Sequence, residues 1–116
     1  EIYKVVESFE QILESIVIGQ EWEDDIRIVL FVKLTEKASL DEKLKTEIKN
    51  KLRQLVSPRH VPAKIISVAD IPRTRSGKIT ELAVRDIIHG KKIKNIEALS
   101  NPEALDLFKD LSELNN

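Results

Sequence analysis

The feature that most constrains the fold is the run Ile26–Leu34, which is apolar on both faces of an extended chain. Side chains of a strand point alternately to its two sides, so every second residue shares a face. One face carries Ile26, Ile28, Leu30, Val32 and Leu34, and Val29 and Phe31 occupy the middle of the other. A strand of this kind must be covered on both sides, which is typical of a sheet enclosed between two layers.

Two further segments predict strands. Ile16–Ile18 is short and β-branched, and it is expected to pair antiparallel with Ile26–Leu34 across a polar loop at Gln20–Asp25. Ile65–Val68 predicts the third strand. The spacing of Ile2, Val5, Val6, Phe9, Ile12 and Leu13 predicts a helix before the first strand.

The remaining segments predict helices. Ser39 and Glu42 fit a capping box, and the helix that they open should stop at Ser57-Pro58. Its expected apolar stripe is Leu40, Leu44, Ile48, Leu52 and Leu55. A helix over 81–89 should end at Gly90.

The C-terminal part, residues 91–116, is expected to be a polar linker and a last helix. Asn101-Pro102 fits an N-cap followed by proline, and the helix would carry an apolar stripe at Leu105, Phe108, Leu111 and Leu114. Residues 1–116 therefore predict one α+β domain, a small three-stranded sheet with helices packed against it.

Composition limits the possible partners. Nineteen basic and twenty acidic residues give a net charge of −1, so any anion site must be local, and neither nucleic acid nor membrane is expected as a partner. The absence of cysteine excludes disulfides and thiolate chemistry. The chain has no methionine and opens on Glu1 directly into a helical pattern, so we expect it to be a piece of a longer polypeptide.

The segment Ile71–Ile79 carries the strongest indication of chemistry. It reads Ile-Pro-Arg-Thr-Arg-Ser-Gly-Lys-Ile, between a predicted strand and a predicted helix. Pro72 stiffens its entry, and Ser76-Gly77 favours a tight turn that presents Lys78 at its tip or exit. A lysine in this setting suits contact with a phosphate or carboxylate, although Ser-Gly-Lys also occurs in plain solvated turns.

The whole chain resembles the small C-terminal domain of the acyl-adenylate-forming enzymes, which include acyl-CoA synthetases, peptide-synthetase adenylation domains and luciferases. Pro72 through Gly77-Lys78-Ile79 is similar to the closing signature of that family. Three other motifs resemble its acetoacetyl-CoA synthetase branch: Glu1-Ile2-Tyr3, Ser57-Pro58-Arg59-His60-Val61-Pro62 and Asn101-Pro102-Glu103.

The resemblance implies a lid domain of an AMP-forming acid:CoA ligase, with Lys78 as the adenylation lysine beside Gly77 and Arg53 as a contact of a CoA phosphate. ATP, with Mg²⁺, and CoA would be the co-substrates. Acetoacetate is the expected acid, and another short-chain acid, as in acetyl-CoA synthetases, is the alternative. The nucleotide-binding domain would lie outside this chain, which would be inactive alone. The resemblance also favours a cytoplasmic enzyme, and no site residue is expected to bind metal.

Several residues keep a plainer interpretation. Arg53 also fits an ordinary solvated arginine, and Arg73 and Arg75 are interpreted as solvated charges around the lysine loop. A hypothesis of a different class is a free-standing α+β module that grips RNA or another polyanion. It would use Arg73, Arg75, Lys78 and Lys91-Lys92.

Overall fold

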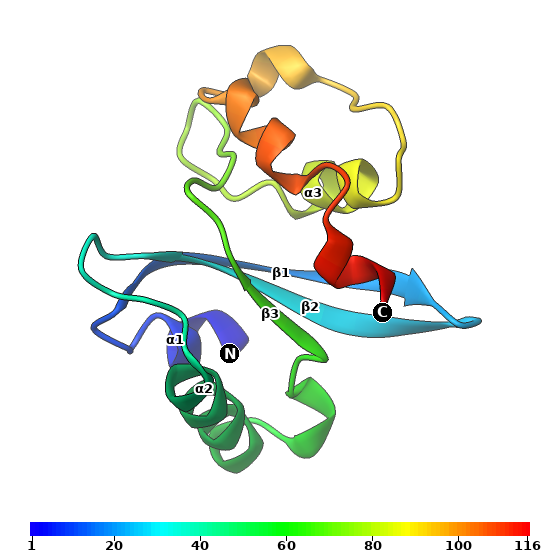
Figure 1. Ribbon diagram of the computed structural model, residues 1–116. Coiled ribbons are helices and arrows are strands. Elements are labelled where there is room, and N and C mark those ends of the chain that lie inside the picture. Colours follow the sequence, from blue (N-terminus) through cyan, green and yellow to red (C-terminus); the bar gives the residue numbers. More distant parts are fainter.

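A computed structural model describes residues 1–116 as a three-stranded sheet covered on both faces (Figure 1). The strands are β1 (Ile12–Trp22), β2 (Asp25–Leu34) and β3 (Lys64–Ser67), in that spatial order. β1 and β2 pair antiparallel, and β2 and β3 pair parallel. The three predicted strands and the antiparallel pair are therefore confirmed, with β2 in the middle of the sheet.

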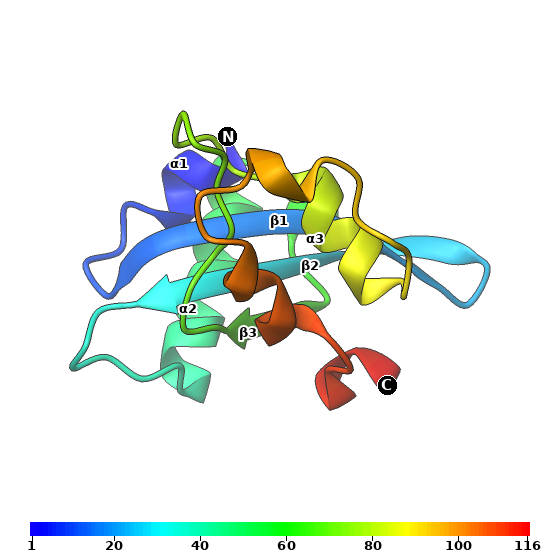
Figure 2. The ribbon, with the colours of Figure 1, turned by 90° about the horizontal axis from the view of Figure 1, so that it is seen from above.

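Helices form a layer on each face. α1 (Ile2–Val6) and α2 (Glu42–Leu55) cover one face, while α3 (Glu81–Ile88) and the C-terminal segment, residues 91–116, cover the other. Figure 2 shows α3 and the C-terminal segment on the same side of the strands. The short 3₁₀ turns η1 (Pro58–His60) and η2 (Ile96–Ala98) lie in the connections.

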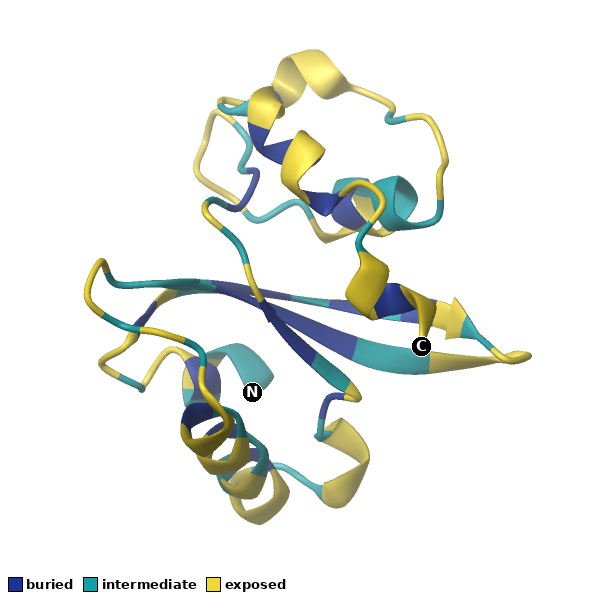
Figure 3. Ribbon diagram, in the orientation of Figure 1, coloured by how far each residue is buried: buried dark blue, intermediate teal, exposed yellow.

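β2 separates two hydrophobic cores, as its sequence predicts, and its centre is buried in Figure 3. The core beneath α1 and α2 contains Val6, Ile12, Leu30, Val32, Leu44, Ile48, Leu52 and Ile65. The core beneath α3 and the C-terminal segment contains Ile16, Ile18, Val29, Phe31, Ile66, Ile71, Val84, Phe108 and Leu114. Alternate residues of one strand thus support two separate layers.

The predicted first helix is too long, because α1 ends at Val6 and Ile12 already pairs with Leu34 in β1. A β-bulge shifts the register between Ile12 and Glu14. The extra residue turns Ile12 toward the α1–α2 core, although Ile16 faces the other core. Helical spacing over 2–13 therefore arose from a short helix followed by a bulged strand.

The loop predicted at Gln20–Asp25 is also wrong in extent. Only Glu23 and Asp24 lie outside the strands, and both have positive φ, 49° and 63°. Two successive left-handed residues match the two-residue hairpin turns whose twist suits a β-ribbon. Neither residue is glycine, so the usual sequence sign of such a turn is missing.

α2 begins at a different cap from the one that the sequence predicts. Asp41 is its N-cap, and its carboxylate accepts a 2.8 Å hydrogen bond from the Leu44 N–H. Ser39 lies two residues too early to cap the helix. Leu44, Ile48 and Leu52 are buried as expected, whereas Leu55 is 64% exposed because the helix ends there.

The predicted continuous last helix is absent, and the end of the C-terminal segment instead forms two 3₁₀ turns, η3 (Pro102–Phe108) and η4 (Ser112–Asn115). Its apolar residues nevertheless face the sheet, and the Phe108 ring meets Phe31 edge to face with centroids 4.8 Å apart. In η4, Leu114 is buried in the same core. Packing in this core, together with hydrogen bonds from Gln20 and Arg27 to the Leu114 carbonyl, holds this segment on the sheet.

The helix over 81–89 is confirmed as α3 within one residue, and Gly90 follows it with φ +72°.

The Tyr3 side chain links three elements, α1, β1 and α3. Its hydroxyl donates to the Glu81 carboxylate at the start of α3 and accepts from the Val17 N–H of β1 at 2.9 Å. Partial burial and the bond to Glu81 raise the pKa of Tyr3 above its ordinary value. None of the helices is long and apolar enough to cross a membrane.

Asp41→Ala is expected to lower the free energy of unfolding by about 0.5–2 kcal/mol, because the Leu44 N–H loses its acceptor. Urea unfolding of the 116-residue chain would measure this change. Ser39→Ala is the matched control and should leave stability unchanged. Equal losses of unfolding free energy in the two variants would contradict the assignment of Asp41 as the cap and support a capping box at Ser39.

Candidate functional site: the Lys78 hairpin

The segment around Lys78 is a tight β-hairpin. Thr74 N–H donates to the Lys78 carbonyl at 2.9 Å, and Gly77 N–H donates to the Thr74 carbonyl at 2.8 Å. Gly77 has φ +87°, in the left-handed region. Three-residue loops of this kind end in a left-handed residue, which glycine adopts without strain. The predicted turn is confirmed, and its conformation explains Gly77 independently of any ligand.

Lys78 lies at the exit of the turn with an exposed side chain. Its backbone N–H donates to the Thr74 hydroxyl at 3.1 Å, which fixes the backbone while leaving the ammonium unengaged. All four ion pairs of the protein use other cations, at Lys33, Lys45, Arg73 and Lys109. The Lys78 ammonium is thus a free positive charge on a firmly hydrogen-bonded backbone.

Arg73, expected to be a solvated charge, is instead a structural anchor of the hairpin. Its Nε donates to Glu14 Oε2 at 3.0 Å, and its Nη1 donates to the Gly77 carbonyl at 2.9 Å. Both side chains of the ion pair are only 27% exposed. The bulge in β1 places Glu14 on the same side as Ile16, so its carboxylate faces the hairpin. The planar guanidinium suits this double contact.

The C-terminal segment touches the other side of the hairpin. Arg75 remains exposed, but its N–H donates to the Ala98 carbonyl at 3.0 Å and its Nε to the Glu97 carbonyl at 3.1 Å. The two arginines on which the polyanion hypothesis relied are therefore engaged within the domain. Sequence reasoning missed these partners, because nothing in the local pattern links 97–101 to 73–75.

Asn101 is the N-cap residue of η3 and Pro102 follows it at the start of that turn, as the sequence predicts, but the Asn101 side chain makes no capping hydrogen bond. Its Oδ1 instead accepts from the Arg73 N–H at 2.8 Å, and its Nδ2 donates to Asp70 Oδ2 at 2.9 Å and to the Ile71 carbonyl at 3.0 Å. The Asn-Pro pair that suggested a cap therefore joins the C-terminal segment to the root of the hairpin.

Asp70 belongs to the same polar cluster. Its Oδ1 lies 3.2 Å from Lys33 Nζ of β2. Partial burial alone would raise the pKa of Asp70, but hydrogen bonds from Asn101, Lys33 and its neighbouring backbone, with the charge of Lys33, outweigh burial and lower it. The carboxylate is thus held ionised at the base of the hairpin.

Arg53 lies far from Lys78 in the architecture. It is exposed near the end of α2, and its Nη1 donates to Asn50 Oδ1 at 3.0 Å, one turn earlier. α2 covers one face of the sheet, and the hairpin belongs to the layer on the other face (Figure 1). The structure therefore does not bring the two predicted site residues together.

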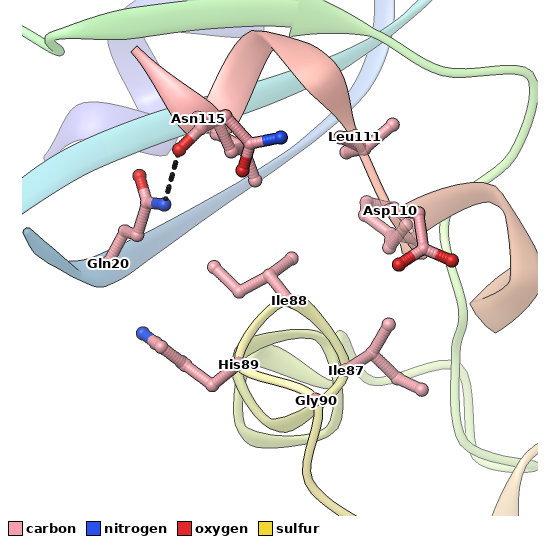
Figure 4. Close-up of a pocket in the computed structure, with 10 residues that line it drawn as sticks. Gln20, Ile87, Ile88, His89, Gly90, Asp110, Leu111 and Asn115 are labelled. Atoms are coloured by element: carbon pink, nitrogen blue, oxygen red, sulfur yellow. Dashed lines mark hydrogen bonds between the residues drawn. The ribbon is translucent and has the colours of Figure 1, made fainter.

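Several hollows flank α3, and two of them adjoin the C-terminal part of the chain. The cavity in Figure 4, of about 300 Å³, lies between the end of α3 and the C-terminal segment. His89 at its wall is engaged, with Nε2 accepting from the Glu21 N–H at 3.0 Å and Nδ1 donating to the Arg85 carbonyl at 2.7 Å. A larger groove of about 830 Å³ runs beside the hairpin, lined in part by Thr74, Lys91 and Lys92. No group of three or more metal-ligating side chains is present.

Comparison with known proteins identifies the domain. The model of the AMP-binding enzyme C-terminal domain family matches residues 1–78, so the matched region ends at Lys78. The chain therefore belongs to the AMP-binding enzyme C-terminal domain family. This result confirms the resemblance on which Lys78 was singled out.

Three relatives extend the comparison. The chain is 63% identical to acetoacetyl-coenzyme A synthetase of Rhizobium meliloti, over 98% of this chain and 18% of that protein. The structure of acetoacetyl-CoA synthetase from Streptomyces lividans is 36% identical, with a TM-score of 0.87 over 99% of this chain and 18% of that one. A benzoate CoA ligase from Burkholderia xenovorans is 27% identical, with a TM-score of 0.66 over 72% of this chain and 17% of that one. This chain thus spans less than a fifth of each relative.

Lys33→Met is expected to raise the pKa of Asp70 toward the ordinary aspartate value, because it removes a hydrogen bond and a positive charge. Since the folded pKa is lowered, the carboxylate stabilises the fold above the ordinary aspartate range, and this contribution is lost as pH falls through the lowered pKa. In the variant this contribution should be smaller, and its loss should be complete at a higher pH. A carboxyl NMR titration of Asp70 measures the shift, with Lys37→Met, an exposed lysine without an ion pair, as control. An unchanged Asp70 pKa in folded Lys33→Met would contradict the assignment.

Proposed function

We propose that this chain is the mobile C-terminal domain of an AMP-forming acetoacetate–CoA ligase. The observation that carries the proposal is the extent of the match. Acetoacetyl-CoA synthetases match 98–99% of the chain, in sequence and in structure, while the benzoate ligase matches only 72%. The part of the chain beyond the common family region is therefore shared with proteins of that activity. Another short-chain acid as substrate is the alternative.

In the proposed first half-reaction, a carboxylate oxygen of acetoacetate attacks the α-phosphorus of ATP, and pyrophosphate leaves. Two anions must approach each other, so a cation between them lowers the barrier. The Lys78 ammonium is suited to this role, because it is exposed and unpaired on a rigid hairpin. In the second half-reaction the CoA sulfur attacks the acyl carbon and AMP leaves, and the lysine is no longer needed there.

The arrangement of the two faces supports a domain that alternates between two poses. Lys78 belongs to the layer above the sheet and Arg53 to the layer below it. One pose would present the hairpin to ATP and the acid, and the other would present a different face for thioester formation. Arg53 would then bind a CoA phosphate, for which its planar charged fork is suited. The acid and nucleotide pockets, and Mg²⁺ with ATP, are assigned to the large domain.

Lys78→Ala in the complete enzyme is expected to lower the rate of acetoacetate-dependent pyrophosphate exchange by about 10²–10³-fold, the usual cost of removing an electrostatic stabiliser. Thioester formation from supplied acetoacetyl-adenylate should be largely spared. Lys37→Ala controls for loss of an exposed lysine. Equal losses in both half-reactions would assign Lys78 a structural role and overturn the proposal.

Arg53→Ala is expected to raise the apparent KM for CoA by about ten- to a hundredfold, because a charge-assisted hydrogen bond contributes ~1.5–3 kcal/mol. Pyrophosphate exchange should remain nearly intact, and the effect should shrink with dephospho-CoA if the contact is to the ribose phosphate. Gln54→Ala, the exposed next residue on α2, is the control. An unchanged KM in the folded variant would leave Arg53 as a solvated charge.

A further inference from the structure

Residues 97–101 of the C-terminal segment run along the first strand of the Lys78 hairpin, residues 73–75. Thr74 and Leu99 form an antiparallel bridge, the Arg75 N–H donates to the Ala98 carbonyl at 3.0 Å, and the Ser100 N–H donates to the Arg73 carbonyl at 2.9 Å. On its other side, the strand 73–75 pairs with the second strand of the hairpin through the antiparallel bridge between Arg73 and Ile79. The hairpin thus gains a third strand from a distant part of the chain.

Asn101 fastens this third strand to the root of the hairpin. It accepts from the Arg73 N–H and donates to the Asp70 carboxylate and to the Ile71 carbonyl, so one side chain contacts three of the four residues that lead into the turn. Ile71 and Pro72 are themselves fully buried, which anchors this root in the core. The residues before and beside Lys78 are therefore held by the C-terminal segment as well as by the sheet.

We infer that segment 97–101 is a positioning element for Lys78 and that Asn101 is the positioning residue that locks it in place. A lysine on a four-carbon stem can act between two anions only if its backbone is held, since small displacements of reacting groups cost large factors in rate. The match to the family model ends at Lys78, so segment 97–101 lies outside the matched region. The inference rests on the proposed role of Lys78 in adenylation.

The structural part is tested by amide hydrogen exchange on the 116-residue chain. Asn101→Ala should make the Thr74 and Gly77 amides exchange about tenfold or more faster, because local opening of the hairpin becomes easier. Amides of β2 should keep their protection. Glu103→Ala, an exposed residue of η3 with no hydrogen-bonded partner, is the matched control. Ser100→Ala removes only the Ser100 hydroxyl bond to the Arg73 carbonyl and gives a milder variant should Asn101→Ala fail to fold.

The catalytic part is tested in the complete enzyme. Asn101→Ala should slow pyrophosphate exchange by about ten- to a hundredfold, as expected for a misplaced catalytic group. The KM for CoA and thioester formation from supplied acyl-adenylate should not change, whereas general destabilisation would lower both half-reactions. Ser100→Ala should act in the same direction with a smaller effect.

The outcomes separate the inference from the function on which it rests. Unchanged exchange at Thr74 and Gly77 in folded Asn101→Ala overturns the inference, whatever the activity. Faster exchange with normal adenylation overturns the positioning role, provided that Lys78→Ala is defective in adenylation. If Lys78→Ala is also normal, the proposed function fails instead. Faster exchange with a selective loss of adenylation supports the inference.

Discussion

The burial of β2 on both faces is the constraint on which the rest of the structure depends. Leu30 and Val32 require one covering layer and Val29 and Phe31 require another, because exposing either set to water would forfeit about 25 cal/mol per Å² of apolar surface. α1 and α2 supply the first layer. The second layer includes the C-terminal segment, which returns across the sheet and places Phe108 on Phe31. The Lys78 hairpin is built between that returning segment and the sheet.

This two-layer design separates the two candidate functions of the domain. The hairpin belongs to one layer and Arg53 to the other, and the three-stranded sheet lies between them. In the proposed enzyme, rotation of the whole domain would exchange one face for the other without unfolding either core. A domain with two complete cores can move as a rigid body, which suits two successive half-reactions at one site.

Arg73 and Lys78 have different roles in the hairpin, and the chemistry of their side chains explains the difference. Arg73 is fixed by a carboxylate and a carbonyl, a double contact that a planar guanidinium makes well. The Lys78 ammonium is exposed and unpaired, although the backbone N–H and carbonyl of Lys78 are both hydrogen-bonded to Thr74. Arg73 thus serves the structure of the hairpin, whereas the unpaired Lys78 ammonium is available to a ligand.

The sequence by itself determined the parts that depend on local pattern: the two-faced strand β2, the three strands and the α+β class, and the glycine turn that presents Lys78. The side-chain period and turn chemistry are properties of neighbouring residues. Only the tertiary structure decided the facing of Ile12, the partner of Arg73 and the role of Asn101. Arg73 meets Glu14 across 59 residues of chain, and Asn101 meets Asp70 across 31. Such contacts exist only after the bulge and the returning C-terminal segment bring distant residues together, so no local pattern encodes them.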